Sequence, residues 1–222
     1  MAVLLQLATM YVPVLNGVFK TEPLHSTELA TAFGVAAVVL FAVEGEKWLK
    51  RREVQERGRH LAAGFARWKV EHEASNREFP GLPFYLLHSF SHLLLTAISL
   101  ECGYPASSLR ERLYGSHDRY GILVYTGSSD AEGTLGGLVL AGRESKRHVR
   151  RALDYGVLCS NDPVCAHHSP TKPDQQLLLG SACHGCLLIA ETSCEQHNDF
   201  LDRSLVVPTL ENLGCELFEM KT

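Results

Sequence analysis

Two cysteine-rich stretches decide how the second half of this chain can fold: Cys159-Ser-Asn-Asp-Pro-Val-Cys165 and Ala182-Cys-His-Gly-Cys-Leu-Leu188. The two residues between Cys183 and Cys186 allow both thiolates to face one ion around a tight turn. Cys194 follows closely, so five thiols fall within 36 residues. We therefore predict a zinc ion held by four of these five cysteines.

Five candidate thiols are available for four ligand positions. The expected ligands are Cys165, Cys183, Cys186 and Cys194, with Cys159 as a substitute ligand or a buried neighbour. His184 lies inside the two-residue spacer, which makes it a poor ligand. Four sulfurs leave no open position on zinc, so the predicted role is structural. Two alternatives stay open: the thiols are simply buried small side chains, or Cys183 and Cys186 form a redox pair.

The composition is that of an ordinary globular protein, with 45% hydrophobic and 21% charged residues among 222. The net charge of −4 gives no global positive field, so nucleic-acid contact would need a local basic patch. No basic n-region or small-residue cleavage site follows Met1, which predicts a cytoplasmic protein. In that compartment clustered cysteines are metal ligands more often than disulfides, and Cys102 and Cys215 stand apart from the cluster.

Upstream of the cysteines, the pattern predicts helices first. The breaker Phe79-Pro-Gly-Leu-Pro83 precedes a strongly apolar helix over Phe84 to Leu100. Gly103-Tyr-Pro105 ends that helix, and Pro105 suits the start of a second short helix, Ala106 to Leu113.

A strand and a basic helix follow. Gly121 to Thr126 is β-branched and aromatic and predicts a buried strand, and Ser128 to Gly137 predicts a glycine-rich loop. Glu144 to Val157 predicts an amphipathic helix with Val149, Ala152 and Leu153 on its inner face. The expected fold class is α+β, with α/β as the alternative, and with a structural zinc lobe at the end.

The N-terminal part has a different character. Ala2 to Val18 and Leu29 to Val43 are mostly apolar and flank a polar turn, which predicts a helical hairpin over residues 1–54. Each stretch is short for a membrane span, so a membrane anchor through residues 1–48 and a buried hairpin are both open. A helix and linker over residues 55–80 place Leu61, Phe65 and Trp68 on one buried stripe. The predicted domain then covers residues 81–207, and residues 208–222 form a tail.

Other polar residues offer weaker signals. His88 and His92 share a helix face, and we interpret them as core histidines with satisfied partners. The functional alternative pairs them with Asp130 or Glu132 beside the glycine-rich loop, as a hydrolase or nuclease site. Gly133 to Gly137 lacks the lysine of a phosphate-binding loop. Arg143 to Arg151 contains five basic residues in nine, either a solvated helix face or a DNA-contacting stripe.

Two resemblances add to these patterns. Leu4 to Leu15, Val18 to Leu24 and Val43 to Arg52 resemble the C-terminal membrane tail of cation-transporting P-type ATPases. The phosphorylated aspartate and the nucleotide domain of that family have no counterpart here, so the resemblance implies a membrane hairpin and no pumping.

The second resemblance covers residues from about 64 to 207 and is carried by motifs in sequence order. They are His88 to Leu95, Glu101 to Tyr114, Gly121 to Thr126, Asp130 to Leu138, Cys159 to Cys165, Ala182 to Leu188, Glu191 to Glu195, Asn198 and Leu201 to Arg203. Together they resemble the C-terminal region of the DrmB family of the DISARM phage-defence system, a domain shared with MrfA-type helicases. The resemblance implies cysteine-bound zinc and a helicase partner that engages DNA.

The leading functional prediction is a non-catalytic zinc-binding accessory module for such a helicase complex, in phage defence or repair. A membrane-tethered fragment with ATPase-like helices is one alternative. An enzyme built on His88, His92, Asp130 and Glu132 is the other, but neither half of the sequence shows a complete active site.

Overall fold

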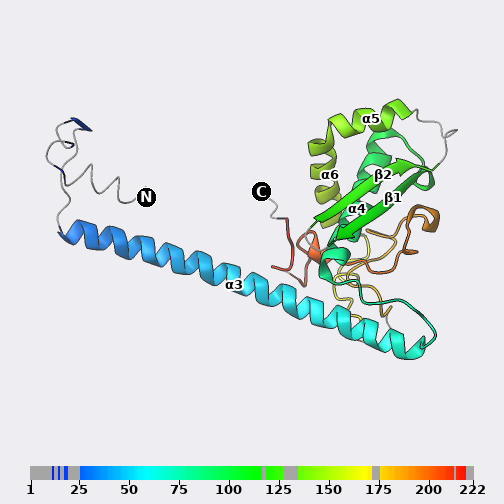
Figure 1. Cartoon of the computed structure of the whole chain (residues 1–222), viewed down its shortest axis with the longest axis horizontal. Coiled ribbons are helices and arrows are strands. Elements are labelled where there is room, and N and C mark those ends of the chain that lie inside the picture. The colour runs from blue at the N-terminus through cyan, green and yellow to red at the C-terminus, as the bar shows by residue number, and fades with distance from the viewer. Residues whose placement is uncertain are drawn as a thin grey trace. The chain divides into compact units, whose positions relative to one another are not determined.

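The computed structural model describes residues 12, 15, 18–19, 26–116, 119–127, 135–171, 176–212 and 214–218. The chain divides into two compact units, Met1–Leu49 and Lys50–Thr222. The described residues include helices α3 to α6, a two-stranded sheet and three short 3-10 turns (Figure 1). The fold is therefore mixed α+β. The α/β alternative is wrong for this part of the chain, because its one described sheet is an antiparallel pair.

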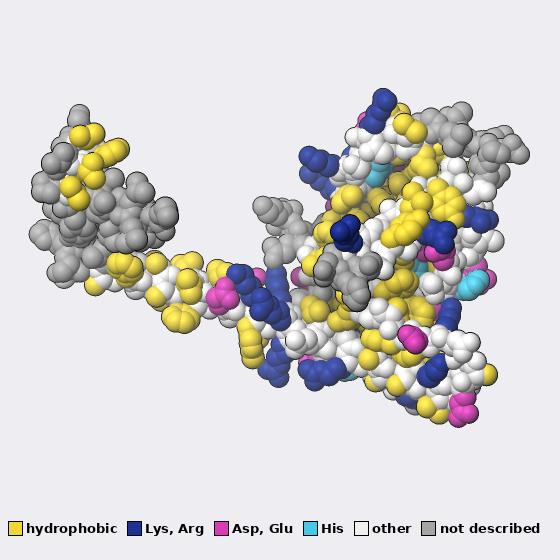
Figure 2. Space-filling view, viewed as in Figure 1, with side chains coloured by type: hydrophobic (Ala, Val, Ile, Leu, Met, Phe, Trp, Pro, Cys, Tyr) yellow, Lys and Arg dark blue, Asp and Glu magenta, His cyan; other side chains and the backbone are white. Residues whose placement is uncertain are grey.

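Helix α3 (Ser26–Glu71) contributes to both units. In the first unit large apolar side chains are exposed, including Val38, Leu40 and Phe41. Figure 2 shows hydrophobic side chains along this part of the helix and basic ones after it. The helix continues unbroken through residue 54, where the sequence analysis placed a domain boundary. The first arm of the expected hairpin lies almost wholly outside the described residues.

In the second unit α3 becomes a packed helix. Leu61 and Phe65 are buried in a cluster with Tyr85 and Phe200, and Trp68 packs at its edge. The predicted stripe is thus confirmed. Burial of this face supplies the hydrophobic stabilisation that the helix alone would lack.

Helix α4 (Leu82–Cys102) forms the centre of the second unit, as the sequence predicted. It begins with Pro83 in its first turn and ends at Gly103, whose φ of 72° is the left-handed C-cap conformation that glycine adopts without strain. The helix contributes Leu93 and Ala97 to one buried cluster and Leu95 and Ile98 to another. It therefore packs on more than one side.

Among the described helices, α4 has the length and hydropathy that a membrane crossing would need. Half of its apolar window is buried inside the protein. A core helix of this kind passes the same test, so the observation does not identify a span.

The sheet pairs β1 (Leu109–Ser116) with β2 (Arg119–Thr126) in antiparallel register, with Glu111 opposite Val124. The predicted strand over Gly121 to Thr126 is confirmed, but the prediction that it is buried is wrong: Leu123 is exposed and the other five residues are only partly buried. The predicted helix over Ala106 to Leu113 is wrong beyond Ser108, where a 3-10 turn ends. Pairing with β2 overrides the local helix preference, since β2 needs a partner for its backbone groups.

Helices α5 (Leu135–Arg143) and α6 (Ser145–Val157) follow the sheet. The predicted glycine-rich loop is therefore wrong for Leu135 to Gly137, which are helical; its earlier part, from Ser128, lies outside the described residues. The amphipathic helix is confirmed, with Ala152 fully buried against α4. After α6 the described chain contains only the 3-10 turns Glu191–Ser193 and Arg203–Leu205 as regular structure. The cysteines lie in this irregular region.

Candidate metal centre

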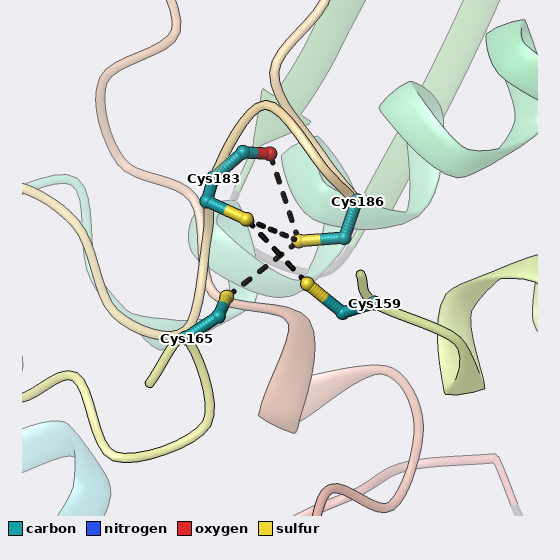
Figure 3. Close-up of side chains that lie close together, drawn as sticks. All are labelled: Cys159, Cys165, Cys183 and Cys186. Atoms are coloured by element: carbon teal, nitrogen blue, oxygen red, sulfur yellow. Dashed lines mark hydrogen bonds between the residues drawn. The ribbon is translucent and has the colours of Figure 1, made fainter. Parts of the chain in front are cut away.

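Four cysteines converge on one point (Figure 3). Cys183 and Cys186 come from one loop, and Cys159 and Cys165 come from the segment that follows α6. The sulfur atoms lie 3.5 Å apart for Cys159 and Cys183 and 3.7 Å apart for Cys165 and Cys186. Cys183 and Cys186 are also 3.7 Å apart. We call these four residues the thiolate cluster.

Backbone hydrogen bonds shape the loop that carries Cys183 and Cys186. The Cys183 carbonyl accepts from the amides of Cys186 and Leu187 at 3.1 and 3.0 Å. The amide of Gly185 donates to Cys183 Sγ at 3.3 Å. A Cβ at Gly185 would come within 2.6 Å of Ser160 Oγ, so a side chain there would require the serine hydroxyl to move away.

The other loop is anchored by a buried arginine. Arg203 donates two hydrogen bonds of 2.8 Å to the carboxylate of Asp162, and it also donates to the carbonyl of Gly156 at the end of α6. Asn161 donates its side-chain amide to Cys183 Sγ at 3.3 Å. The segment between Cys159 and Cys165 is therefore held in place by contacts that do not depend on the sulfurs alone.

The sulfurs share protons in a way that favours metal binding. A hydrogen bond with Cys165 lowers the pKa of Cys186 to about 6, and the same bond raises the pKa of Cys165. Burial raises the pKa of Cys159 to about 11. One thiolate thus forms readily at neutral pH, and a bound cation would stabilise the deprotonated form of the others.

The donor set fits zinc. A tetrahedral ion with Zn–S distances of roughly 2.3 Å places its sulfurs about 3.8 Å apart. The three sulfur–sulfur distances are 3.5, 3.7 and 3.7 Å, close to that value. Cys165 is buried and the other three are partly buried, so a bound ion would be enclosed by protein.

Cys194 is placed elsewhere. The expected set combined Cys194 with Cys165, Cys183 and Cys186, whereas the structure places Cys159 with those three. Loop geometry explains the difference: the Asp162–Arg203 contact brings both ends of the Cys159 to Cys165 segment to the site. His184 is exposed and lies outside the cluster.

Cys194 instead joins His88, His92 and Glu111 in what we call the interior cluster. Its ligand atoms all lie within 4.8 Å of one another, and all four residues are buried. Glu111 Oε1 lies 2.9 Å from His88 Nε2 and 3.3 Å from His92 Nε2. His88 Nε2 lies 3.2 Å from Cys194 Sγ.

The interior cluster is strongly polarised. Burial raises the pKa of Glu111 and Cys194, but hydrogen bonds from both histidines outweigh it and lower both values, that of Cys194 to about 6. Burial lowers the pKa of His88, but its hydrogen bonds to Cys194 and Glu111 raise it to about 9. Anionic forms of the carboxyl and thiol groups are thus favoured inside the core.

The two histidines are core residues with partners, as interpreted from the sequence. Both have 0% exposure, so neither ring lies at the protein surface. Asp130 and Glu132, their expected acidic partners, lie outside the described residues. The acid that meets them is Glu111, which the sequence analysis missed. The available signal was the two-residue spacing of Leu109, Glu111 and Leu113 just before a predicted strand. Residues two apart in a strand face the same side, so this spacing places Glu111 on the face of the two leucines.

The basic segment Arg143 to Arg151 folds as the N-terminal part of α6 and the residues before it. Arg147 and Arg151 form ion pairs with Glu101 at 3.4 and 3.2 Å, and buried His148 lies 3.0 Å from the same carboxylate. Part of this positive charge is therefore compensated within the protein.

Similarity to known proteins follows the same division of the chain. Residues 90–187 match the family described as the MrfA Zn-binding domain. That range contains the whole thiolate cluster. The curated "DISARM protein DrmB" of Bacillus paralicheniformis is 40% identical over 176 residues, which cover 78% of this chain. The match spans only 31% of that relative, about a third of its length. The resemblance of this region to the DrmB family and to the domain of MrfA-type helicases is confirmed.

Residues 1–49 match the family described as the C-terminus of cation transporting ATPases. This range coincides with the first compact unit. Two different family models thus match, one over the first unit and the other within the second.

Proposed function

We propose that this chain is a non-catalytic accessory module whose irregular C-terminal region is held together by zinc at the thiolate cluster. The observation that supports it most directly is the convergence of four sulfurs at separations suited to a tetrahedral ion. A four-sulfur site leaves no position for water or substrate, so the metal stabilises structure and does not activate a reactant.

The match of residues 90–187 to a Zn-binding domain supports the identity of the ion. The similarity to "DISARM protein DrmB" supports a place for the module in a DISARM-type defence complex. We propose that its partner there is a helicase-type subunit and that the complex acts in the cytoplasm. Basic side chains of residues 143–151 that are not compensated by Glu101 would then contact DNA phosphates.

Zinc content of the purified full-length chain tests the metal proposal. Elemental analysis is expected to find zinc that Cys183→Ala removes from the thiolate cluster. The matched control is Cys102→Ala, because Cys102 lies in neither cluster and is only partly buried. Equal zinc in Cys183→Ala and Cys102→Ala would contradict the proposal.

Co-expression with the helicase-type subunit of a DISARM system tests the partner. The full chain is expected to co-purify with it, and the DNA affinity of the complex is expected to fall steeply with salt. Lys146→Gln with Arg150→Gln should reduce the salt slope by about two. Absence of co-purification by a correctly folded, zinc-loaded chain would remove the partner proposal and leave the zinc module standing.

A membrane anchor in the first unit is the second candidate. Two observations favour it: the exposed apolar side chains of α3 and the match of residues 1–49 to ATPase membrane tails. The double variant Val38→Asp with Phe41→Asp should release the full chain from the membrane fraction. Val70→Asp is the control, since Val70 is a 72% exposed residue of the same helix within the other unit. Equal fractionation of the two variants would remove the anchor.

A further inference from the structure

The interior cluster lies at the junction of three parts of the second unit. His88 and His92 lie one turn apart on α4, Glu111 lies on β1, and Cys194 follows the 3-10 turn Glu191–Ser193. Their exposures are 0%, 0%, 1% and 5%. None of the four belongs to the thiolate cluster.

A hydrogen bond from Nδ1 to a backbone carbonyl orients each histidine ring. His92 Nδ1 lies 2.8 Å from the carbonyl oxygen of Leu187, and His88 Nδ1 lies 3.3 Å from that of Phe200. A carbonyl only accepts, so in each ring Nδ1 carries the proton and donates. Nε2 of each ring therefore faces the other ligand groups: it donates to them when the ring is doubly protonated, and it offers a lone pair to a metal ion when the ring is neutral. Histidines that bind metals are oriented by this kind of hydrogen bond.

Fixed donors also favour the anionic forms of the other two groups. Cys194 Sγ accepts hydrogen bonds from the amides of Gln196 and Asn198 at 3.3 and 3.2 Å. The chain curls around this sulfur through left-handed backbone at His197 and Asn198, with φ of 55° and 64°. Histidine and asparagine adopt this conformation more readily than most non-glycine residues, and residues held in it cluster at functional sites. The hydroxyl of Ser91 lies against the second carboxylate oxygen of Glu111.

The result is a closed group of four electron-pair donors facing one another. Among the described residues, the groups that pair with Glu111 and Cys194 here are the two histidine rings. A single divalent cation would take the place of the Nε2 protons and accept one lone pair from each of the four residues, whose ligand atoms already lie within 4.8 Å of one another. Buried charged groups are normally paired in this way or bound to a metal.

We propose that His88, His92, Glu111 and Cys194 form a second metal site, independent of the thiolate cluster, that binds zinc or a similar transition-metal cation. Nitrogen, sulfur and carboxylate oxygen are ligands that zinc accepts together, and ligand atoms around it lie roughly 3.3 to 3.6 Å apart. The separations here are 2.9, 3.3 and 3.2 Å, so a small outward movement accommodates the ion. All four positions are filled by protein, so this ion fastens α4, the sheet and the C-terminal region to one another.

Metal stoichiometry of the full-length chain, purified after growth in zinc-supplemented medium, tests the proposal. Elemental analysis for zinc, iron, cobalt and nickel is expected to give two metal ions per chain. X-ray absorption at the zinc edge is expected to show five sulfur and three nitrogen or oxygen ligands shared by two ions. This measurement uses the unaltered protein and does not depend on whether any variant folds.

Variants assign the two ions. His92→Ala and Cys194→Ala should each lose one ion and keep an all-sulfur spectrum, whereas Cys183→Ala should lose the all-sulfur signal and keep the mixed one. Arg112→Ala is the control beside Glu111, because its side chain is 59% exposed. If a variant does not fold, the absorption spectrum of the unaltered chain decides.

The outcomes separate this site from the proposed function. One ion per chain with only sulfur ligands overturns the interior site and leaves the thiolate centre in place. One ion with a mixed ligand set supports the interior site and contradicts the thiolate centre. Two zinc ions per chain in both His92→Ala and Cys194→Ala would also overturn the interior site.

Discussion

The thiolate cluster and the interior cluster gather the same kind of chemistry by opposite routes. The first takes two pairs of cysteines from two short loops, and the second takes residues from a helix, a strand and a distant turn. The first is partly exposed, and the second is fully enclosed. A metal site can therefore be predicted from the spacing of its ligands in the sequence only when those ligands share a local turn.

The two clusters are nevertheless linked. The amide of Leu187 donates to the carbonyl of Cys183, and the carbonyl of Leu187 accepts from His92. A movement of the cysteine loop therefore reaches the histidine directly.

Removal of metal should have the largest effect. Structural zinc contributes about 10 kcal/mol or more to folding in small zinc domains, so chelation should lower the melting temperature by over about 10 °C. The partly exposed thiolate cluster should release its ion first, and the enclosed cluster should release its ion later. Calorimetry during a timed chelator titration of the full chain measures both steps, and an unchanged melting temperature would contradict a structural role.

Glu111→Gln should have the next largest effect. The change preserves shape but removes the carboxylate that faces both histidines at 2.9 and 3.3 Å. Removing one member of a buried charged group costs about 3–5 kcal/mol. Urea denaturation measures the loss. A cost below about 1 kcal/mol would show that the interior cluster contributes little to stability.

A third buried charged group contains no cysteine, and it predicts how the stability of the protein changes at low pH. Asp202 pairs with Arg57 at 2.5 Å and accepts from the amide of Ser181, two residues before Cys183. Burial raises the pKa of Asp202, but the charge and hydrogen bond of Arg57 outweigh it, and the pKa falls below its ordinary value.

The folded state therefore favours the carboxylate. Its stabilisation is complete above the unfolded-state pKa of about 3.9 and is lost as the pH falls through the folded-state value. The urea midpoint should decrease below about pH 4 in the unaltered chain and change less in Asp202→Asn. Parallel acid curves for the two proteins would contradict this assignment.

Arg112→Gln should have the smallest effect. Arg112 follows Glu111 on β1, and its ion pair with Glu195 is 3.6 Å long with both side chains exposed. Exposed pairs contribute at most about 1 kcal/mol, so the urea midpoint should hardly change. A cost that approaches that of Glu111→Gln would mean that the strand itself, and not the buried carboxylate, is the sensitive feature.

The sequence predicted several elements well because their signals are local. The apolar run of α4, its glycine end and the amphipathic pattern of α6 specify helices within a few turns. It failed at Leu109 to Leu113, where a helix-like composition forms β1 only because β2 pairs with it. That error concealed Glu111, since only a strand directs this side chain toward His88 and His92.

By itself, the sequence determined the chemistry of the thiolate site: two cysteines two residues apart, further thiols nearby and a glycine at the bend. It also determined that His88 and His92 share one helix face, because the helical repeat sets that geometry. Only the tertiary structure decided that Cys159 completes the thiolate set and that Cys194 joins the histidines. The reason is physical: a short turn fixes the positions of ligands within it, whereas ligands far apart in the chain meet only where packing and buried ion pairs bring their segments together.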